Sequence, residues 1–290
     1  MSPTLLGALL MTASMAAFTM NDTMLKLTAG TIPLFQLVFV RSVITCTLML
    51  LTKNRIGALH FRVSKQDWWL IGLRASTEIC ISYFFLKALF QMPLANLTAI
   101  MQVVPLAVTL ASAVVLREAV GWRRFAAVFI GFLGVLLIVK PGADGFTVWS
   151  VYALIAMLGV TARDLITRKL SPSVPSMTVA FSTAALVGAA FGLASLSESW
   201  VTIPAPTWVL IVGSAVAIMA GYFCSIWVMR VGEVSFTAPF RYTGLVWALL
   251  MGWIVFGEWP GWMTQIGAII VVATGVLPRT TAFIPLKTPF

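Results

Sequence analysis

Long apolar runs recur along the whole chain, and each is bounded by glycine, proline, tryptophan or charged residues. A helix needs about 20 mostly apolar residues to cross a bilayer. A run such as 125–139 is apolar on every face, whereas strands of membrane β-barrels are about ten residues long and alternate polar with apolar positions. The pattern therefore predicts an all-α integral membrane protein with ten transmembrane helices. Their expected bounds are 5–27, 33–52, 68–90, 94–116, 122–139, 148–167, 175–196, 207–229, 236–256 and 260–277.

The composition agrees with this pattern. Of the 290 residues, 60% are hydrophobic and 10% are charged, and the mean hydropathy is +1.00. An ordinary soluble domain is about half apolar and about a quarter charged. The composition therefore excludes a soluble enzyme, and ten membrane helices in this length leave no room for a separate soluble domain.

Positive charge is unevenly distributed between the predicted loops. With a cytoplasmic N-terminus, twelve of the 19 lysines and arginines fall on the cytoplasmic side, and the other side holds only Lys26 and Lys140. Cytoplasmic loops of membrane proteins are enriched in these residues. We therefore predict that both termini are cytoplasmic, in a bacterial-type inner (plasma) membrane. The formal net charge of +10 is then mainly a topology signal, and no nucleic-acid partner is expected.

The second half of the chain repeats the first. A shift of 140 residues places Glu118 on Glu258 and Trp122 on Trp262, while a shift of 143 aligns Lys26 with Lys169. The match predicts two units, 1–140 and 141–290, with five helices each. Because five is odd, the second unit enters the membrane in the opposite orientation. Such inverted repeats are typical of secondary transporters that bind substrate near the middle of the bilayer.

The ends of the two units carry similar motifs. The first contains the segments 93–96 (PLAN) and 116–118 (LRE), and the second contains 238–243 (APFRYT) and 256–258 (FGE). These motifs resemble those of the EamA family in the drug/metabolite transporter superfamily. The resemblance covers nearly the whole chain. It implies ten helices in two inverted five-helix EamA repeats, with helices 1–4 and 6–9 around a central cavity and helices 5 and 10 at the periphery.

Three ionisable residues, Arg41, Arg74 and Glu78, are expected inside predicted helices. An unpaired charge at the centre of a membrane helix costs about 2.5–3.5 kcal/mol, so each should face a partner or water. Arg74 and Glu78 are four residues apart, which permits an ion pair. Glu78 is a candidate for proton coupling or amine binding, and the arginines are candidates for a substrate carboxylate. A static ion pair is the alternative.

A polar stripe follows the fourth predicted helix. It consists of Thr98, Gln102, Pro105 and Thr109. Their spacing keeps them on one helix face. Because proline removes a backbone donor, this face is a candidate cavity wall with exposed carbonyl acceptors. Hydrogen bonding between helices is the alternative. In the second unit, the polar residues in this region are Arg241 and Tyr242.

Polar residues at related positions in the two units are candidates for gates. Asn21 and Asp22 lie near the outer end of the first predicted helix, and Arg163 and Asp164 lie near the inner end of the sixth. The shift of 143 places Asn21 on Asp164. For Arg163, extension of a long side chain to the membrane surface is an equally good explanation.

Two aromatic residues are candidates for stacking on a planar substrate. Tyr83 lies in the third predicted helix and Trp227 in the eighth, and an interface anchor is the alternative for Trp227. Glu118 and Glu258 are expected to cap the helices that follow them. Gly134 and Gly267 suit close helix packing.

No catalytic machinery is evident in the sequence. The chain has no phosphate-binding loop, and its single histidine, His60, falls in a predicted loop. We expect no enzyme activity, no cofactor and no metal site. The predicted function is secondary transport of a small organic metabolite by alternating access, with proton coupling. Export of an amino acid, including an aromatic one, is the first choice. The alternatives are uptake or exchange of a cofactor-like metabolite such as riboflavin or S-adenosylmethionine, and a non-transporting membrane scaffold.

Overall fold

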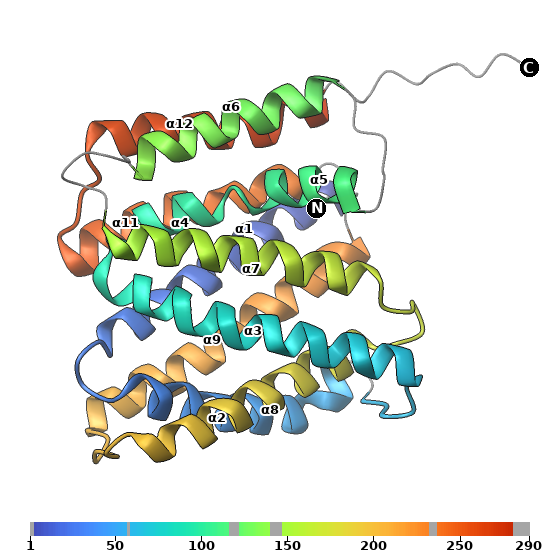
Figure 1. Ribbon diagram of the computed structural model, residues 1–290, viewed down its shortest axis with the longest axis vertical. Coiled ribbons are helices and arrows are strands. Elements are labelled where there is room, and N and C mark those ends of the chain that lie inside the picture. Colours follow the sequence, from blue (N-terminus) through green and yellow to red (C-terminus); the bar gives the residue numbers. More distant parts are fainter. Residues whose placement is uncertain (1–2, 57–58, 116–121, 140–146, 232–236, 281–290) are drawn as a thin grey trace, which may run out of the picture.

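The protein is described by a computed structural model, which covers residues 3–56, 59–115, 122–139, 147–231 and 237–280. Within these ranges the secondary structure is helical and contains no strand. The first half contains α1 (Pro3–Leu27), α2 (Leu34–Ile56), α3 (Lys65–Gln91), α4 (Leu94–Met101), α5 (Val104–Val115) and α6 (Trp122–Val139). The second half contains α7 (Val148–Arg168), α8 (Ser176–Ala194), η1 (Ser195–Ser197), α9 (Ala205–Val231), η2 (Ala238–Tyr242), α11 (Thr243–Phe256) and α12 (Trp262–Thr280). Figure 1 shows these helices in one bundle.

The helices agree closely with the ten apolar runs, but two runs are interrupted. The fourth divides into α4 and α5 at Gln102, and the ninth consists of η2 followed by α11. By length and composition, seven segments of the described chain are able to cross a membrane, and 129–138 and 262–274 are shorter apolar helices. The all-helical membrane architecture is therefore confirmed, while ten membrane crossings remain a prediction.

Helix packing follows the internal repeat. α1 packs on α9, and their counterparts in the other half, α7 and α3, pack on each other. In the same way, the α2–α9 contact corresponds to the α8–α3 contact. The pairs α2–α8 and α6–α12 each join a helix to its own counterpart, and the α1–α11 contact corresponds to the α7–α5 contact. Exchanging the two halves therefore leaves this packing pattern unchanged. The proposed boundary between the units, at residues 140 and 141, lies outside the described residues.

The α6–α12 pair lies along one edge of the bundle, as the family resemblance implied for the fifth and tenth helices (Figure 1). Two glycines allow the backbones of these helices to approach. A Cβ atom on Gly267 would lie 2.5 Å from the carbonyl oxygen of Gly134, and one on Gly134 would lie 2.9 Å from that of Gly267. Their predicted role in close packing is confirmed.

At the end of the bundle where α1 ends and α4 begins, the interior is filled by large apolar side chains. These are Leu25, Leu37, Leu89, Leu94, Leu97 and Ile100, all at most 2% exposed. We call this group the leucine plug. The prediction that Glu258 caps the helix beginning at Trp262 is wrong, because its carboxylate accepts a hydrogen bond from the backbone N–H of Leu94. Glu118 lies outside the described residues.

Candidate functional site

A polar cavity of about 590 Å³ lies between the helices of the two halves. Its walls come from α1, α2, α3, α5, α7 and α9, with single residues from α4, α8 and η2 (Met101, Val187 and Arg241) and with Gln102 between α4 and α5. Ten residues singled out in the sequence line it: Asn21, Asp22, Arg41, Glu78, Gln102, Pro105, Thr109, Arg163, Asp164 and Arg241. The cavity therefore gathers most of the charged residues that the apolar runs contain.

The first charged group joins α1 to α2. The amide of Asn21 donates to the carboxylate of Asp22 at 2.8 Å, and its oxygen accepts from Nη2 of Arg41 at 2.9 Å. Asn21 is buried. The Nε of Arg41 is also buried, and it has no hydrogen-bond partner within the described chain. We call these three residues the Asn21 cluster. It holds one positive and one negative charge, linked by an amide.

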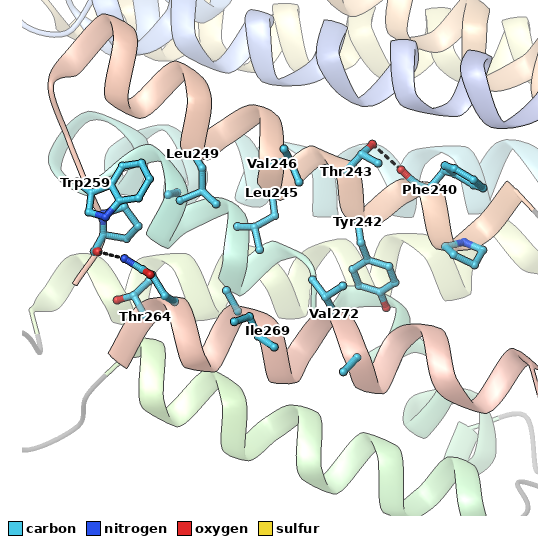
Figure 2. A pocket seen from close by; sticks show the side chains of 16 residues that line it. Phe240, Tyr242, Thr243, Leu245, Val246, Leu249, Trp259, Thr264, Ile269 and Val272 are labelled. Carbon is cyan, nitrogen blue, oxygen red and sulfur yellow. Dashed lines mark hydrogen bonds between the residues drawn. The ribbon is translucent and has the colours of Figure 1, made fainter. Parts of the chain in front are cut away.

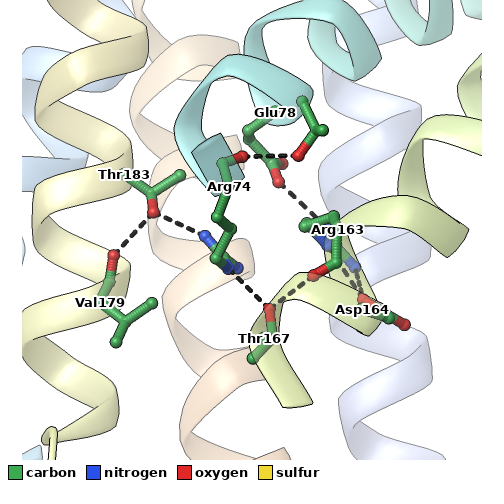
Figure 3. Close-up of polar contacts among 8 residues, drawn as sticks. Arg74, Glu78, Arg163, Asp164, Thr167, Val179 and Thr183 are labelled. Carbon is green, nitrogen blue, oxygen red and sulfur yellow. Dashed lines mark hydrogen bonds and ion pairs between the residues drawn. The ribbon is translucent and has the colours of Figure 1, made fainter. Parts of the chain in front are cut away.

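The second charged group joins α3 to α7 (Figure 3). Arg163 donates to Asp164 from Nη2 at 2.9 Å and from Nε at 3.1 Å, and its Nη1 lies 3.2 Å from Oε2 of Glu78. These side chains are between 22% and 33% exposed, so they are within reach of the cavity contents. We call this the Arg163 cluster. Within this cluster, two carboxylates share one guanidinium.

Arg74 lies beside this cluster but outside the cavity wall. Its Nη1 donates to the hydroxyl of Thr183 at 2.6 Å, and its Nε donates to that of Thr167 at 3.1 Å (Figure 3). The ion pair that the spacing of Arg74 and Glu78 permits is absent from the described chain. Glu78 pairs instead with Arg163. Helical spacing places two residues on one face, but a neighbouring helix decides which partner is nearer.

The interruptions in the fourth and ninth runs meet at the cavity. Gln102, which follows α4, donates from Nε2 to the backbone carbonyl of Arg241 in η2 at 3.2 Å. Thr109 lines the cavity and donates to the carbonyl of Pro105 at 2.8 Å. Thr98, the first residue of the predicted stripe, is outside the cavity lining. The stripe therefore provides both a cavity wall and a contact between helices.

The aromatic candidates lie elsewhere. Tyr83 packs against Phe35. The ammonium group of Lys87 lies over the Tyr83 ring, 5.9 Å from its centroid, in a cation–π contact. Trp227 is 48% exposed and packs on Phe223. Neither residue lines the polar cavity. The exposed position of Trp227 agrees with the alternative of an interface anchor.

Tyr242 lines a different pocket, which lies between α11 and α12 and has a volume of about 830 Å³ (Figure 2). Leu245, Leu249, Ile269 and Val272 supply much of its wall. Because this lining is almost entirely apolar, the pocket is unsuited to a charged metabolite. Tyr242 and Arg241, the two polar residues noted in this region of the second unit, therefore line different pockets.

Several residues of the cavity wall were not predicted from the sequence. Tyr222 and Ser225 of α9 line it, and the shift of 140 places them on Ser82 and Phe85 of α3, which line it as well. The repeat relates the two pairs to each other, but neither pair carries a charge that would make it conspicuous in the sequence. Arg168 also lines the cavity and donates to the hydroxyl of Ser112 at 3.0 Å. Because Arg168 lies at the end of α7, its position in the sequence suggests only a cytoplasmic surface charge.

Comparison with protein families identifies the scaffold that carries this cavity. The model of the EamA-like transporter family matches residues 5–140 and again residues 147–277. The chain belongs to this family. The resemblance inferred from the motifs is thus confirmed, and the two matches correspond to the two repeats. This EamA protein is a multi-pass membrane transporter and not an enzyme, so the scaffold alternative is not retained.

Relatives of this EamA protein differ in the names of their substrates. It is 29% identical to the riboflavin transporter of Vibrio cholerae serotype O1 over 213 residues, which cover 73% of this chain and 70% of the relative. It is 25% identical to an S-adenosylmethionine uptake transporter of Rickettsia bellii over 185 residues, covering 62% of each. It is 26% identical to the pseudopaline exporter CntI of Pseudomonas aeruginosa over 280 residues, covering 94% and 96%. Both uptake and export therefore occur among its relatives.

A solved crystal structure supports the fold independently of sequence. It superposes with a TM-score of 0.67 and covers 96% of this chain and 98% of the other, at 16% sequence identity. A resemblance at this level of identity concerns the fold alone. The substrate class must therefore be inferred from the geometry of the cavity.

Proposed function

We propose that this EamA transporter exports a small zwitterionic metabolite of the amino-acid type through the central cavity. The proposal rests on one observation. A single cavity holds two charged clusters that differ in their balance of positive and negative groups. The Arg163 cluster has two carboxylates for one guanidinium, which suits a substrate ammonium group. Arg41 has unused donor capacity, and guanidinium groups bind carboxylates well. A zwitterion satisfies both requirements at once.

The size of the cavity agrees with this class of substrate. Binding sites for small molecules have volumes of about 300–1,000 Å³, and this cavity has about 590 Å³. That volume leaves space beside the charged groups for an apolar or aromatic side chain. Phe18, Phe85 and Tyr222 in its wall offer aromatic surface to such a group.

Alternating access is the mechanism we propose. Ten crossings in two inverted repeats, 1–140 and 141–290, would let the cavity open first to one side and then to the other. The symmetric packing of α1 on α9 and of α3 on α7 supports this arrangement. The cavity extends to the exposed side chain of Arg168. With cytoplasmic termini, that end faces the cytoplasm, so the cavity is positioned to load a substrate for export.

Proton coupling is part of the proposal. Carboxylates inside membrane segments are common elements of proton pathways. Glu78 and Asp164 share a single guanidinium at the cavity wall, and the carboxylate of Asp22 accepts a hydrogen bond from the neutral amide of Asn21. Of these, Glu78 is the preferred coupling residue because it joins α3 to α7. Asn21, Asp22, Arg163 and Asp164 remain candidates for gate residues.

The second candidate function is uptake or exchange of a larger metabolite such as riboflavin or S-adenosylmethionine. It is favoured by the names of two relatives, the Vibrio and Rickettsia transporters. The cavity volume is also larger than a simple amino acid requires. The charges in the wall do not distinguish this candidate from the first, since both positive and negative groups are present.

Efflux from proteoliposomes distinguishes the two candidates. Purified protein is reconstituted with internal labelled phenylalanine, alanine, riboflavin or S-adenosylmethionine, and release is measured with and without a pH gradient. We expect saturable, protein-dependent efflux of an amino acid that the Arg41→Gln variant largely loses. Movement of riboflavin or S-adenosylmethionine alone would overturn the first candidate in favour of the second. Absence of movement for every compound would contradict both.

A further inference from the structure

A cluster of polar contacts closes the end of the bundle opposite Arg168. Near the end of α1, the Nζ of Lys26 lies 2.8 Å from Oε1 of Glu258, which follows α11. The same ammonium group donates to the backbone carbonyl of Met92, just before α4. The side chain of Lys26 is only 9% exposed. Burying an ammonium group is costly unless it is paired and hydrogen-bonded, and these partners meet that requirement.

Glu258 is held in place independently of Lys26. Its Oε2 accepts from the backbone N–H of Leu94 at 3.0 Å, where a helix N-terminus favours negative charge. Gly257, with φ of 64°, ends α11 in the left-handed conformation. The turn it makes is fixed by a hydrogen bond of 2.9 Å from the N–H of Glu258 to the carbonyl of Gly252. The carboxylate is therefore presented at a defined position.

These contacts join the two halves of the transporter. Lys26, Met92 and Leu94 belong to the first half, and Glu258 belongs to the second. Lys26 also lies over the ring of Phe256, 4.8 Å from its centroid. One lysine and one glutamate thus tie the ends of α1 and α11 to the start of α4. We call the Lys26–Glu258 pair, with its two backbone partners, the clasp.

The leucine plug lies between the clasp and the cavity. Leu25 is adjacent to Lys26 in sequence and lines the cavity, and Leu94 accompanies the clasp at the start of α4. Both are at most 2% exposed. At the other end, the cavity reaches the exposed side chain of Arg168. The structure is therefore closed at the Lys26 end.

We infer that Lys26 and Glu258 are gate residues, whose ion pair holds the Lys26 end shut and separates when the cavity opens there. This inference rests on the alternating access proposed above. Opening this end requires the ends of α1, α4 and α11 to move apart, and the clasp joins all three. Breaking the pair in a variant should therefore shift the population toward the state open at the Lys26 end. In the predicted orientation, that end faces the outside of the cell.

Thiol labelling tests the inference without a substrate. Cys46, Cys80 and Cys224 are replaced by serine, and a single cysteine is introduced as Val38→Cys, at a buried position of the cavity wall. A membrane-impermeant maleimide is applied to either face of oriented vesicles. We expect Lys26→Met and Glu258→Gln each to raise labelling from the Lys26 side by about tenfold, which corresponds to about 1.4 kcal/mol. Labelling from the Arg168 side should fall.

Glu198→Gln is the matched control. Its carboxylate lies at a helix N-terminus too, accepting from the N–H of Phe35 at 3.2 Å, but no lysine pairs with it in the described chain. Labelling in this variant should stay at the parental rate. The exchanged variant Lys26→Glu/Glu258→Lys should lower labelling from the Lys26 side again. It distinguishes loss of charge pairing from loss of folding as the cause of the higher labelling in the single variants.

Unchanged labelling from the Lys26 side in both well-folded single variants would overturn the gate. So would an equal rise in the Glu198→Gln control. Because accessibility is measured without substrate, failure of the gate is distinguishable from failure of the proposed substrate. If Val38→Cys can be labelled from only one face under all conditions, including in the clasp variants, alternating access itself is contradicted.

Discussion

Gln102 donates a hydrogen bond of 3.2 Å to the backbone carbonyl of Arg241, and this bond joins the two points at which the fourth and ninth apolar runs depart from α-helix. The two positions are 139 residues apart in the chain. A backbone carbonyl outside the regular helical pattern, deep in a membrane protein, needs a donor from protein or water. This carbonyl accepts from the backbone N–H of Thr243, and Gln102 adds a second donor across the boundary between the two halves.

Replacing Gln102 by leucine should slow transport while the protein still folds. A hydrogen bond contributes about 0.5–1.5 kcal/mol net, so we expect the rate to fall about two- to tenfold. Gln265→Leu is the control, since its amide also donates to a carbonyl, that of Pro260, but at the edge of the bundle. Equal rates for Gln102→Leu and the parent protein in proteoliposomes would exclude a role for this contact in transport.

Glu78→Gln should remove stimulation by a pH gradient, because glutamine cannot exchange a proton. It also removes one charged partner of Arg163, and hydrogen bonds to charged groups contribute about 1.5–3 kcal/mol, so the rate should fall about tenfold or more. Asp164→Asn is measured in parallel because it leaves Glu78 intact. Transport that keeps its pH dependence in Glu78→Gln would assign Glu78 to a static ion pair.

Arg41→Lys should weaken substrate binding more than it slows turnover. Lysine keeps the charge but loses the planar arrangement of donors that binds a carboxylate and contacts Asn21. We expect KM for a transported amino acid to rise about tenfold, the equivalent of about 1.4 kcal/mol. Arg74→Lys serves as the comparison, because Arg74 is outside the cavity wall. A similar rise in both variants would indicate a general effect on packing.

Gly267→Leu should destabilise the protein through the α6–α12 contact. Any Cβ at this position would lie 2.5 Å from the carbonyl oxygen of Gly134, so the helices must separate. Overpacking of this kind costs about 1–3 kcal/mol, which corresponds to a fall of about 5 °C in the thermal midpoint in detergent. Gly72→Leu is the control, since nothing lies within 4 Å of a Cβ there. An unchanged midpoint for Gly267→Leu would contradict the observed approach of the backbones.

Much of the architecture was predictable because the membrane imposes it locally. Backbone groups in a bilayer must be satisfied within the segment, so an apolar run of sufficient length is a helix whatever surrounds it. The interruption near Gln102 was also predictable locally, because Pro105 lacks the backbone N–H donor that a regular helix uses. The second interruption has no proline at the corresponding position, where Leu245 stands. It takes the form of a 3₁₀ segment that contains Pro239.

The choice of partners was not predictable from spacing. Arg74 and Glu78 share a helix face, yet Arg74 donates to two threonine hydroxyls and Glu78 pairs with Arg163. The Lys26–Glu258 pair joins residues 232 positions apart, whereas the sequence predicted that Glu258 caps the helix that follows it. Such pairs depend on the rotation and depth of helices that are distant in the chain, and hydrophobic periodicity does not specify either quantity.

The sequence by itself determined the helical membrane class, the internal repeat, the family and the set of charged residues available inside the helices. The cost of placing charge in hydrocarbon makes those residues conspicuous and requires that they be paired or hydrated. Only the tertiary structure decided which of them surround one cavity, which pair with each other, and which end of that cavity is closed. These outcomes depend on contacts between helices from different halves of the chain, and such contacts exist only once the two repeats have packed together.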